Sequence, residues 1–223
     1  MTETPNLPAL GVRPNVREEI AEALRAALVA GEMRPGVVYS APVLAERFGV
    51  SATPVREAML DLAKEGLVTA VRNKGFRVTE LTARDLDEIT AVRTLIEVPT
   101  VGKVAESVPA ERIAALRPMA EAIVEAAERG DTIAYIEADH AFHLELLALA
   151  GNQHLIEVVE RLRYRSRLYG VPKLAQSQEL GFYAREHLEL LDTVASGDPD
   201  AASAAMDHHL RHVRNAWADD PTP

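Results

Sequence analysis

Residues 44–68 read LAERFGVSATPVREAMLDLAKEGLV, and this pattern predicts two helices joined by a tight turn. Ser40 can cap the first helix, which runs to Gly49. The second begins at Thr53 and Pro54, because proline is tolerated in the first turn of a helix. Its apolar residues recur at helical spacing, at Val55, Met59, Leu62 and Leu67. Two helices around a short turn that contains glycine are typical of a helix-turn-helix.

The segments on either side of this stretch complete a small module. Asn15 followed three residues later by Glu18 is a typical helix start, and Gly31 ends that helix. Its apolar face consists of Val16, Ile20, Leu24 and Leu28. On the other side, residues 67–81 read as two short strands joined by a turn at 73–75, with three basic residues around the turn. Such a hairpin is the wing of a winged helix-turn-helix.

This module resembles the winged helix-turn-helix of GntR-type bacterial transcription regulators, both in residues 44–68 and in the NKGFRV that follows. In that family, the start of the recognition helix enters the major groove of DNA and the wing tip approaches the minor groove. The resemblance therefore implies DNA contacts by Ser51, Thr53, Arg56, Lys74 and Gly75. Family members commonly have arginine after the serine. Ala52 stands there in this chain, so that contact is not carried over.

Arg56 is the strongest of these candidates. From the first turns of the recognition helix, its guanidinium can form a bidentate pair with a guanine edge or bind a phosphate. The alternative is that the helix-turn-helix packs against protein and that Arg56 pairs with Glu57 or Asp61 on a solvated surface. The order of helix, turn, recognition helix and basic wing favours DNA.

The charge of the chain is distributed unevenly. The formal net charge is −10 over 223 residues. Residues 1–80 contain 10 basic and 10 acidic residues, whereas residues 81–223 contain 14 and 24. A neutral-to-basic module followed by an acidic one is compatible with phosphate contact by the first part only.

Composition also limits the chemistry and the location. There is no cysteine, so disulfides and sulfur-ligated metals are excluded, and any transition metal must be held by histidine and carboxylate. The N-terminus has no basic stretch followed by an apolar run, and no segment approaches 18 continuous apolar residues. We therefore expect a soluble, cytoplasmic protein with no membrane contact.

From residue 81 onward the sequence shows helical periods only. Thr82 and Asp85 have the pattern of a capping box, and Pro99 interrupts the helix that follows. The predicted helical spans are 83–107 with a kink, 110–129, 131–150, 152–170, 176–195 and 199–217. The expected fold class is mainly α. A winged helix-turn-helix domain at residues 1–80 precedes an all-α bundle of about six helices at 81–218.

Polar side chains lie on apolar faces of three of these helices. In DHAFH at 139–143, Asp139 and His143 fall on the apolar side at i and i+4, the spacing that lets two side chains converge on one point. His140 lies on the flank of the same face. His187 shares the apolar face of its helix. In the last helix, a helical-wheel projection places His209, rather than His208, near the apolar face.

Each histidine taken alone is better explained as a buried imidazole bonded to a backbone carbonyl. The set is better explained by a metal, because one inward carboxylate and three inward imidazoles would otherwise each need a partner. One divalent ion satisfies all four groups. Nitrogen and oxygen ligands without sulfur suit zinc, which we expect, or nickel or manganese.

Residues 85–215 resemble the FCD effector-binding domain of the FadR branch of GntR regulators. The marks of the resemblance are RTLIE at 93–97, DHAFH followed by AGN, EHLELLDTVASGD and HHL. In metal-binding members, the ligands are an aspartate and three histidines, which fall on Asp139, His143, His187 and His209.

The same resemblance implies an effector. Family members use this metal to help hold small carboxylates, with an arginine of the domain's first helix nearby, and Arg93 matches that position. The alternative for Arg93 is an intrahelical pair with Glu97. Four further arginines are expected to be a mixture of solvated and pocket residues: Arg161, Arg163, Arg165 and Arg167.

These features predict a ligand-responsive transcription regulator that represses as a homodimer on pseudo-palindromic, double-stranded operator DNA. A rival interpretation keeps the regulator but makes the metal purely structural. A second rival is a metalloenzyme that activates water at the three histidines and the aspartate. An enzyme would need a general base, and Glu145 and Glu186 are both expected to point away from the site. We therefore expect no catalytic role.

Overall fold

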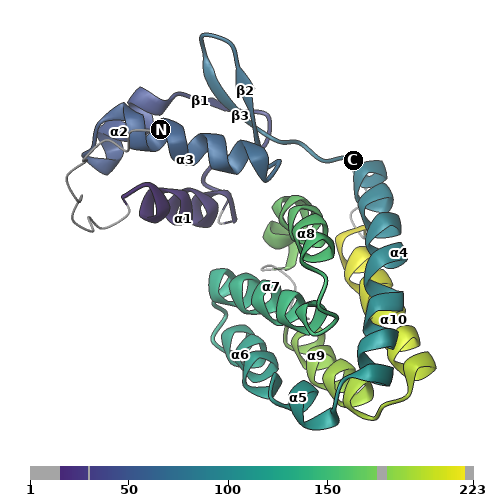
Figure 1. Ribbon diagram of the computed structural model, residues 1–223. Coiled ribbons are helices and arrows are strands. Elements are labelled where there is room, and N and C mark those ends of the chain that lie inside the picture. The colour runs from purple at the N-terminus through teal and green to yellow at the C-terminus, as the bar shows by residue number, and fades with distance from the viewer. Residues whose placement is uncertain (1–15, 30, 175–179, 219–223) are drawn as a thin grey trace, which may run out of the picture.

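The computed structural model describes residues 16–29, 31–174 and 180–218, with side chains except at 29, 167–174 and 216–218. Asn15, the predicted helix start, and the side chain of Arg167 lie outside this part. Figure 1 shows a small N-terminal lobe of helices with a projecting hairpin, and a larger lobe made of helices alone. The mainly α fold class is confirmed.

The N-terminal lobe is a winged helix-turn-helix. Its elements are α1 (Val16–Val29), β1 (Val38–Tyr39), α2 (Ala41–Phe48), α3 (Ala52–Lys64), β2 (Val68–Val71) and β3 (Gly75–Val78). Gly49 ends α2 in the left-handed conformation, with φ of 66°, and Ser51 is the N-cap residue of α3. The recognition helix α3 therefore starts one residue before the predicted Thr53.

The wing contains a strand that the sequence did not predict. The sheet order is β1-β3-β2, and both pairings are antiparallel. At the wing turn, Gly75 has φ of 133°, and a Cβ there would lie 2.2 Å from the carbonyl oxygen of Tyr39 in β1. Glycine is thus required at this position by the close approach of β1, whatever the wing contacts.

The C-terminal lobe is an all-α bundle. Its helices are α4 (Ala83–Ser107), α5 (Ala110–Ala114), α6 (Arg117–Glu128), α7 (Thr132–Ala148), α8 (Gln153–Leu174), α9 (Leu180–Ala195) and α10 (Pro199–Ala218). The single helix predicted at 110–129 is wrong, because the chain breaks between α5 and α6. Pro118 lies in the first turn of α6 and has no N–H to donate to a preceding turn, so the chain starts a new helix there.

Helix α4 is not interrupted by Pro99. The capping box is present, with the Thr82 hydroxyl accepting from the Asp85 amide, and the helix continues to Ser107. One turn after the proline, Gly102 lets α10 pack closely, since a Cβ there would lie 2.3 Å from Oγ of Ser203. The hydroxyl of Ser203 also donates to the carbonyl oxygen of Val98, so α10 packs against α4 on both sides of the proline.

Each lobe has its own buried core. The N-terminal core is formed by α1, α2, α3 and the wing strands, and the larger core lies among α4 to α10. Tyr164 of α8 packs against the N-terminal core, and α8 also contacts α1. Helix α8 therefore joins the two lobes (Figure 1). No described helix has the length and apolar character needed to cross a membrane.

Candidate metal centre and nucleic-acid interface

Three histidines from three helices meet inside the bundle. His143 belongs to α7, His187 to α9 and His209 to α10, and all three are buried. Each offers one ring nitrogen, and these nitrogens lie within 4.8 Å of one another. We call this set the tri-histidine cluster. The fully buried ring of Phe142 meets His143 and His187 edge-on, which keeps the neighbouring space apolar.

Hydrogen bonds fix the tautomers of two of these rings. Nδ1 of His187 lies 3.1 Å from the carbonyl oxygens of Tyr183 and Ala184, so it must donate. Nδ1 of His209 lies 3.2 Å from Oε2 of Glu186 and donates to that carboxylate. In both rings the lone pair is therefore on Nε2. This arrangement, in which the second nitrogen is held by a carbonyl or carboxylate, is the one that metal-binding histidines generally use.

Asp139 lies beside the cluster. Its Oδ1 is 3.2 Å from Nε2 of His187 and 3.9 Å from Nε2 of His143, while its Oδ2 pairs with Arg163 at 2.6 Å. Two ligand atoms bound to one zinc ion at about 2.1 Å stand roughly 3.4 Å apart in a tetrahedral arrangement. The lone pair of His187 and the oxygen of Asp139 therefore have the separation of two ligands of one ion.

His143 differs from the other two histidines of the tri-histidine cluster in its hydrogen bonding. Both of its ring nitrogens are buried and have no hydrogen-bond partner, an arrangement that is costly unless another group satisfies them. Burial lowers the pKa of His143 well below its usual value, with help from the charge of Arg163. Burial also lowers the pKa of His187 and of His209 to about 4 each. At neutral pH all three imidazoles are therefore uncharged, which is the state that binds a metal.

Arg163 is a site residue that the sequence left among four undivided arginines. It is buried, and its Nη2 lies 2.6 Å from Oδ2 of Asp139 while its Nη1 lies 3.5 Å from Oε2 of Glu97. Its Nε has no hydrogen-bond partner, and Nη1 has only this long contact with Glu97. Burial lowers the pKa of Arg163 to about 9. The spacing of Arg163 from the buried Val159 and Ser166 on α8 is the signal that a helical wheel could have used.

Arg93, the predicted effector contact, forms the intrahelical pair that was its alternative. Its Nε lies 2.6 Å from Oε1 of Glu97, and both side chains are buried. Because Glu97 also faces Arg163, a chain of charged groups runs from Arg93 through Glu97 and Arg163 to Asp139. Arg93 thus lies two groups away from the predicted metal ligands.

The predicted outward position of Glu186 is wrong. Its carboxylate contacts Nδ1 of His209 and Nδ1 of His212 on α10. Burial alone would raise the pKa of Glu186, but the hydrogen bonds from these two histidines outweigh it and the pKa is lowered. The wheel failed because α9 packs against α10 as well as α6, so two adjacent positions on α9 both face other helices. Glu145 is exposed, as predicted.

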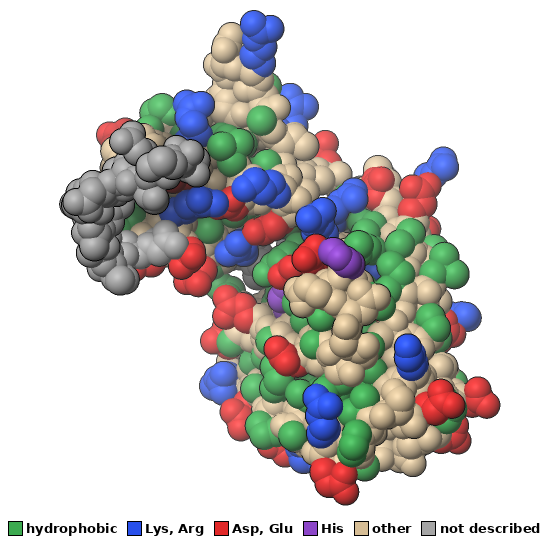
Figure 2. All heavy atoms as spheres, viewed as in Figure 1, with side chains coloured by type: hydrophobic (Ala, Val, Ile, Leu, Met, Phe, Trp, Pro, Cys, Tyr) green, Lys and Arg blue, Asp and Glu red, His purple; other side chains and the backbone are tan. Residues whose placement is uncertain are grey.

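The predicted DNA contacts belong to two parts of the N-terminal lobe, the start of α3 and the wing turn. Ser51, Thr53 and Arg56 are exposed at the start of α3, and Lys74 is exposed at the wing turn beside the half-buried Gly75. Asp61, one of the two alternative partners considered for Arg56, is engaged by Arg17 and Lys64. Basic side chains also project from the tip of the hairpin in Figure 2. The exposed basic residues at the wing are Arg72, Lys74 and Arg77.

Comparison with known proteins agrees with both lobes. Residues 16–78 match the model of the bacterial regulatory proteins of the gntR family, and residues 88–212 match that of the FCD domain. The HTH-type transcriptional regulator YdhC of Bacillus subtilis is 30% identical over 191 residues, which cover 82% of this chain and 85% of YdhC. The HTH-type transcriptional repressor RspR of Escherichia coli is 26% identical over 89% of this chain and 87% of its own.

The fold has a close counterpart among solved structures. The E. coli McbR/YncC structure superposes with a TM-score of 0.75 at 26% identity, covering 90% of this chain and 95% of that chain. These relatives are named as transcriptional regulators, in agreement with the expectation that the chain is not an enzyme. The winged helix-turn-helix, the helical bundle and the family matches together show that the chain belongs to the GntR family and is a DNA-binding transcriptional regulator with an FCD domain.

Proposed function

We propose that this regulator is a repressor that binds a divalent transition metal at the tri-histidine cluster and Asp139. A small carboxylate bound there lowers the affinity of the protein for operator DNA. The single observation that supports this most strongly is His143, whose two ring nitrogens are buried without a hydrogen-bond partner. A metal satisfies one of these nitrogens together with Nε2 of His187 and of His209. Three imidazoles and a carboxylate suit zinc, and nickel or manganese less closely.

We assign Arg163 to the effector. When bound, the metal supplies a Lewis-acidic centre that can hold a carboxylate oxygen. Arg163 pairs with Asp139 through Nη2, and its buried Nε has no hydrogen-bond partner, so Nε can donate to a second carboxylate oxygen. Arg93 then acts on the effector indirectly, because it pairs with Glu97 and Glu97 faces Arg163.

Helix α8 offers a route from this centre to the DNA-binding lobe. Arg163 faces the centre, whereas the adjacent Tyr164 faces the N-terminal lobe, where the guanidinium of Arg25 lies 5.8 Å above its ring. Arg25 in turn pairs with Glu65, the residue that follows α3. A shift of Arg163 toward an effector would therefore move the residue on which α1 and α3 rest.

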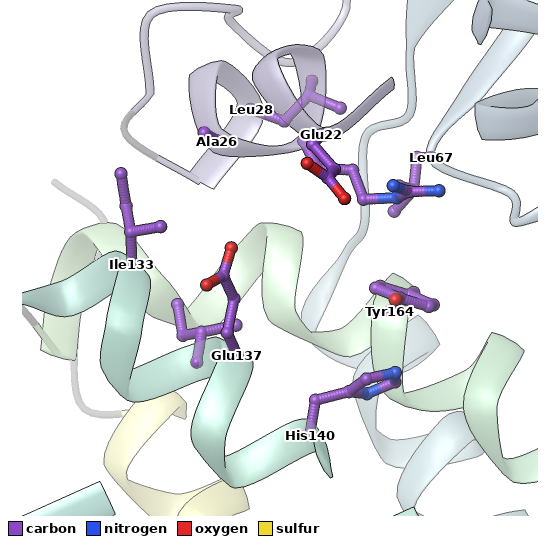
Figure 3. A pocket seen from close by; sticks show the side chains of 10 residues that line it. Glu22, Ala26, Leu28, Leu67, Ile133, Glu137, His140 and Tyr164 are labelled. Atoms are coloured by element: carbon purple, nitrogen blue, oxygen red, sulfur yellow. The ribbon is translucent and has the colours of Figure 1, made fainter. Parts of the chain in front are cut away.

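A hollow of about 410 Å³ separates the lobes at this contact. Figure 3 shows Tyr164 beside His140 on its lower side and Glu22 of α1 on its upper side. The rings of His140 and Tyr164 are 4.2 Å apart, and His140 directly follows Asp139 in α7. The space leaves room for the lobes to change their relative placement, and a second connection to the centre runs through His140.

The remaining parts of the proposal concern assembly and output. A homodimer fits a pseudo-palindromic operator, because helix-turn-helix regulators place one recognition helix in each half-site. Repression is supported by RspR, a relative that is named a transcriptional repressor. A cytoplasmic location fits a protein that binds DNA.

Replacing Arg163 with lysine tests the effector assignment. Lysine keeps the positive charge between Asp139 and Glu97 but lacks the several planar N–H donors of the guanidinium group. We expect zinc binding to persist, while affinity for the best ligand in a panel of mono-, di- and tricarboxylates falls roughly 10- to 150-fold, as expected for the loss of a charged hydrogen bond. Calorimetry on the zinc-loaded protein measures this. Arg161→Lys, an exposed change on the same helix, is the matched control. Equal carboxylate affinity in both variants would remove Arg163 from the effector site.

A further inference from the structure

A second group of metal-binding side chains lies outside the tri-histidine cluster. Glu186 of α9 and His208 and His212 of α10 each offer one ligand atom, and these atoms lie within 4.8 Å of one another. We call this set the outer cluster. His208 is exposed and the His212 side chain is 28% exposed, whereas that of Glu186 is 11% exposed. The outer cluster therefore has a partly buried carboxylate and an imidazole face open to solvent.

The spacing of the two histidines suits chelation. His208 and His212 stand at i and i+4 on α10, and their ring centroids are 5.5 Å apart. Two histidines at this spacing on one helix face are the arrangement by which helices commonly present a pair of ligands to zinc. Glu186 adds an oxygen from the facing helix α9, so the outer cluster can hold an ion with two nitrogens and one oxygen and leave positions for water.

The surroundings hold these side chains in place. The ring centroid of His212 lies 4.7 Å from that of Tyr183 and 5.5 Å from that of Phe182. Nδ1 of His212 contacts Oε1 of Glu186. His208 and Glu186 line a hollow of about 380 Å³ that gives access from solvent. Glu189 adds negative charge to this hollow. The positive charge of Arg185 is shared with Glu128, 3.5 Å away.

We propose that the outer cluster is a second, solvent-facing site for a divalent transition cation. This site contains none of the residues assigned to the inner metal, so its existence does not depend on the proposed function. The two sites are nevertheless connected. Oε1 of Glu186 faces His212, and Oε2 of the same carboxylate accepts from Nδ1 of His209 in the tri-histidine cluster. An ion in the outer cluster withdraws charge from the carboxylate that orients His209, and loading of the outer site thereby alters zinc affinity at the inner one.

Zinc binding to the full-length chain tests the proposal. Protein that already retains zinc after desalting is titrated with further zinc by equilibrium dialysis. We expect the wild-type chain to bind one more ion, and His208→Ala and His212→Ala each to weaken this second binding at least ~10-fold, since loss of even an outer-shell partner can cost that much. His154→Ala is the matched control, because His154 is an exposed histidine with a glutamate 3.9 Å away on its own helix. This variant should bind the second ion as the wild type does.

The outcomes separate the two metal sites. If the wild-type chain binds no ion beyond one that His143→Ala loses, or if His208→Ala and His212→Ala bind the further ion as tightly as His154→Ala, the outer site is refuted. His143→Ala should lose the retained zinc and keep the titrated ion. A chain that binds only one ion, lost in His212→Ala and kept in His143→Ala, would support the outer site while contradicting the proposed function.

Discussion

Replacement of His143 with alanine should abolish the zinc that the protein retains after desalting. The ring of His143 is fully buried and its nitrogens have no hydrogen-bond partner, so no hydrogen bond explains a polar side chain at this position. Loss of an outer-shell partner costs about 10- to 100-fold in metal affinity, and loss of a direct ligand should cost more than ~100-fold. Metal analysis of the desalted protein measures the retained zinc, and His154→Ala, which removes an exposed histidine, should keep it.

Circular dichroism of the same variant separates a metal that anchors an effector from one that is structural. The core around the site is formed by apolar side chains from several helices, including Phe142, Leu146 and Leu191. We therefore expect His143→Ala to retain its helicity and a cooperative melting transition while losing its response to carboxylates. Unfolding of this variant, or of the wild type after chelation, would favour the structural interpretation. Retained zinc at the wild-type level would contradict the metal site itself.

Replacement of Arg56 with alanine should weaken binding to a DNA fragment selected by the wild-type protein from a random library. Arg56 is exposed on the first turns of α3, and Asp61, one of its two alternative partners, is engaged by Arg17 and Lys64. A base-reading arginine contributes about 1 to 3 kcal/mol, equivalent to roughly a 5- to 150-fold loss of affinity. Fluorescence anisotropy at fixed salt measures this change.

The specificity of the Arg56→Ala variant distinguishes base from phosphate contact. A lost guanine contact relaxes selectivity at one position, whereas a lost phosphate contact weakens binding to all sequences and reduces the salt dependence by about one charge. Arg129→Ala is the control, because Arg129 is an exposed arginine just after α6 in the helical lobe. Equal operator affinity for Arg56→Ala and Arg129→Ala would contradict the assignment of α3 as the recognition helix.

The parts of the fold that the sequence predicted have strong local signals. Gly49 ends α2, and the alternation around Gly75 defines the wing, so the helix-turn-helix and hairpin follow from short-range rules. Strand β1 has only two residues, Val38 and Tyr39, and forms by pairing with β3, which no local pattern reveals. The break before α6 depends on one proline in a segment whose apolar spacing is otherwise continuous.

The same distinction applies to the candidate site. The wheels brought His143, His187 and His209 to apolar faces, and the structure brings these side chains together. Arg163 was left undivided among four arginines expected to be partly solvated and partly in a pocket, and Glu186 was expected to point outward because it precedes an inward histidine. Each instead contacts a neighbouring helix, Arg163 through its pair with Asp139 of α7 and Glu186 through its contacts with α10. Such burial depends on how helices pack, and a single helical wheel does not contain that information.

Operator affinity in four states tests most directly whether a carboxylate bound at the metal weakens DNA binding. The states are zinc-free and zinc-loaded protein, each alone and each with the carboxylate that raises the melting temperature of the zinc-loaded protein most. All four are compared at one salt concentration, because DNA affinity depends steeply on salt. We predict that the carboxylate lowers the operator affinity of the zinc-loaded protein by about 5- to 150-fold, a coupling of roughly 1 to 3 kcal/mol, and has no effect without zinc. Identical operator affinity of the zinc-loaded protein with and without carboxylate would contradict the account.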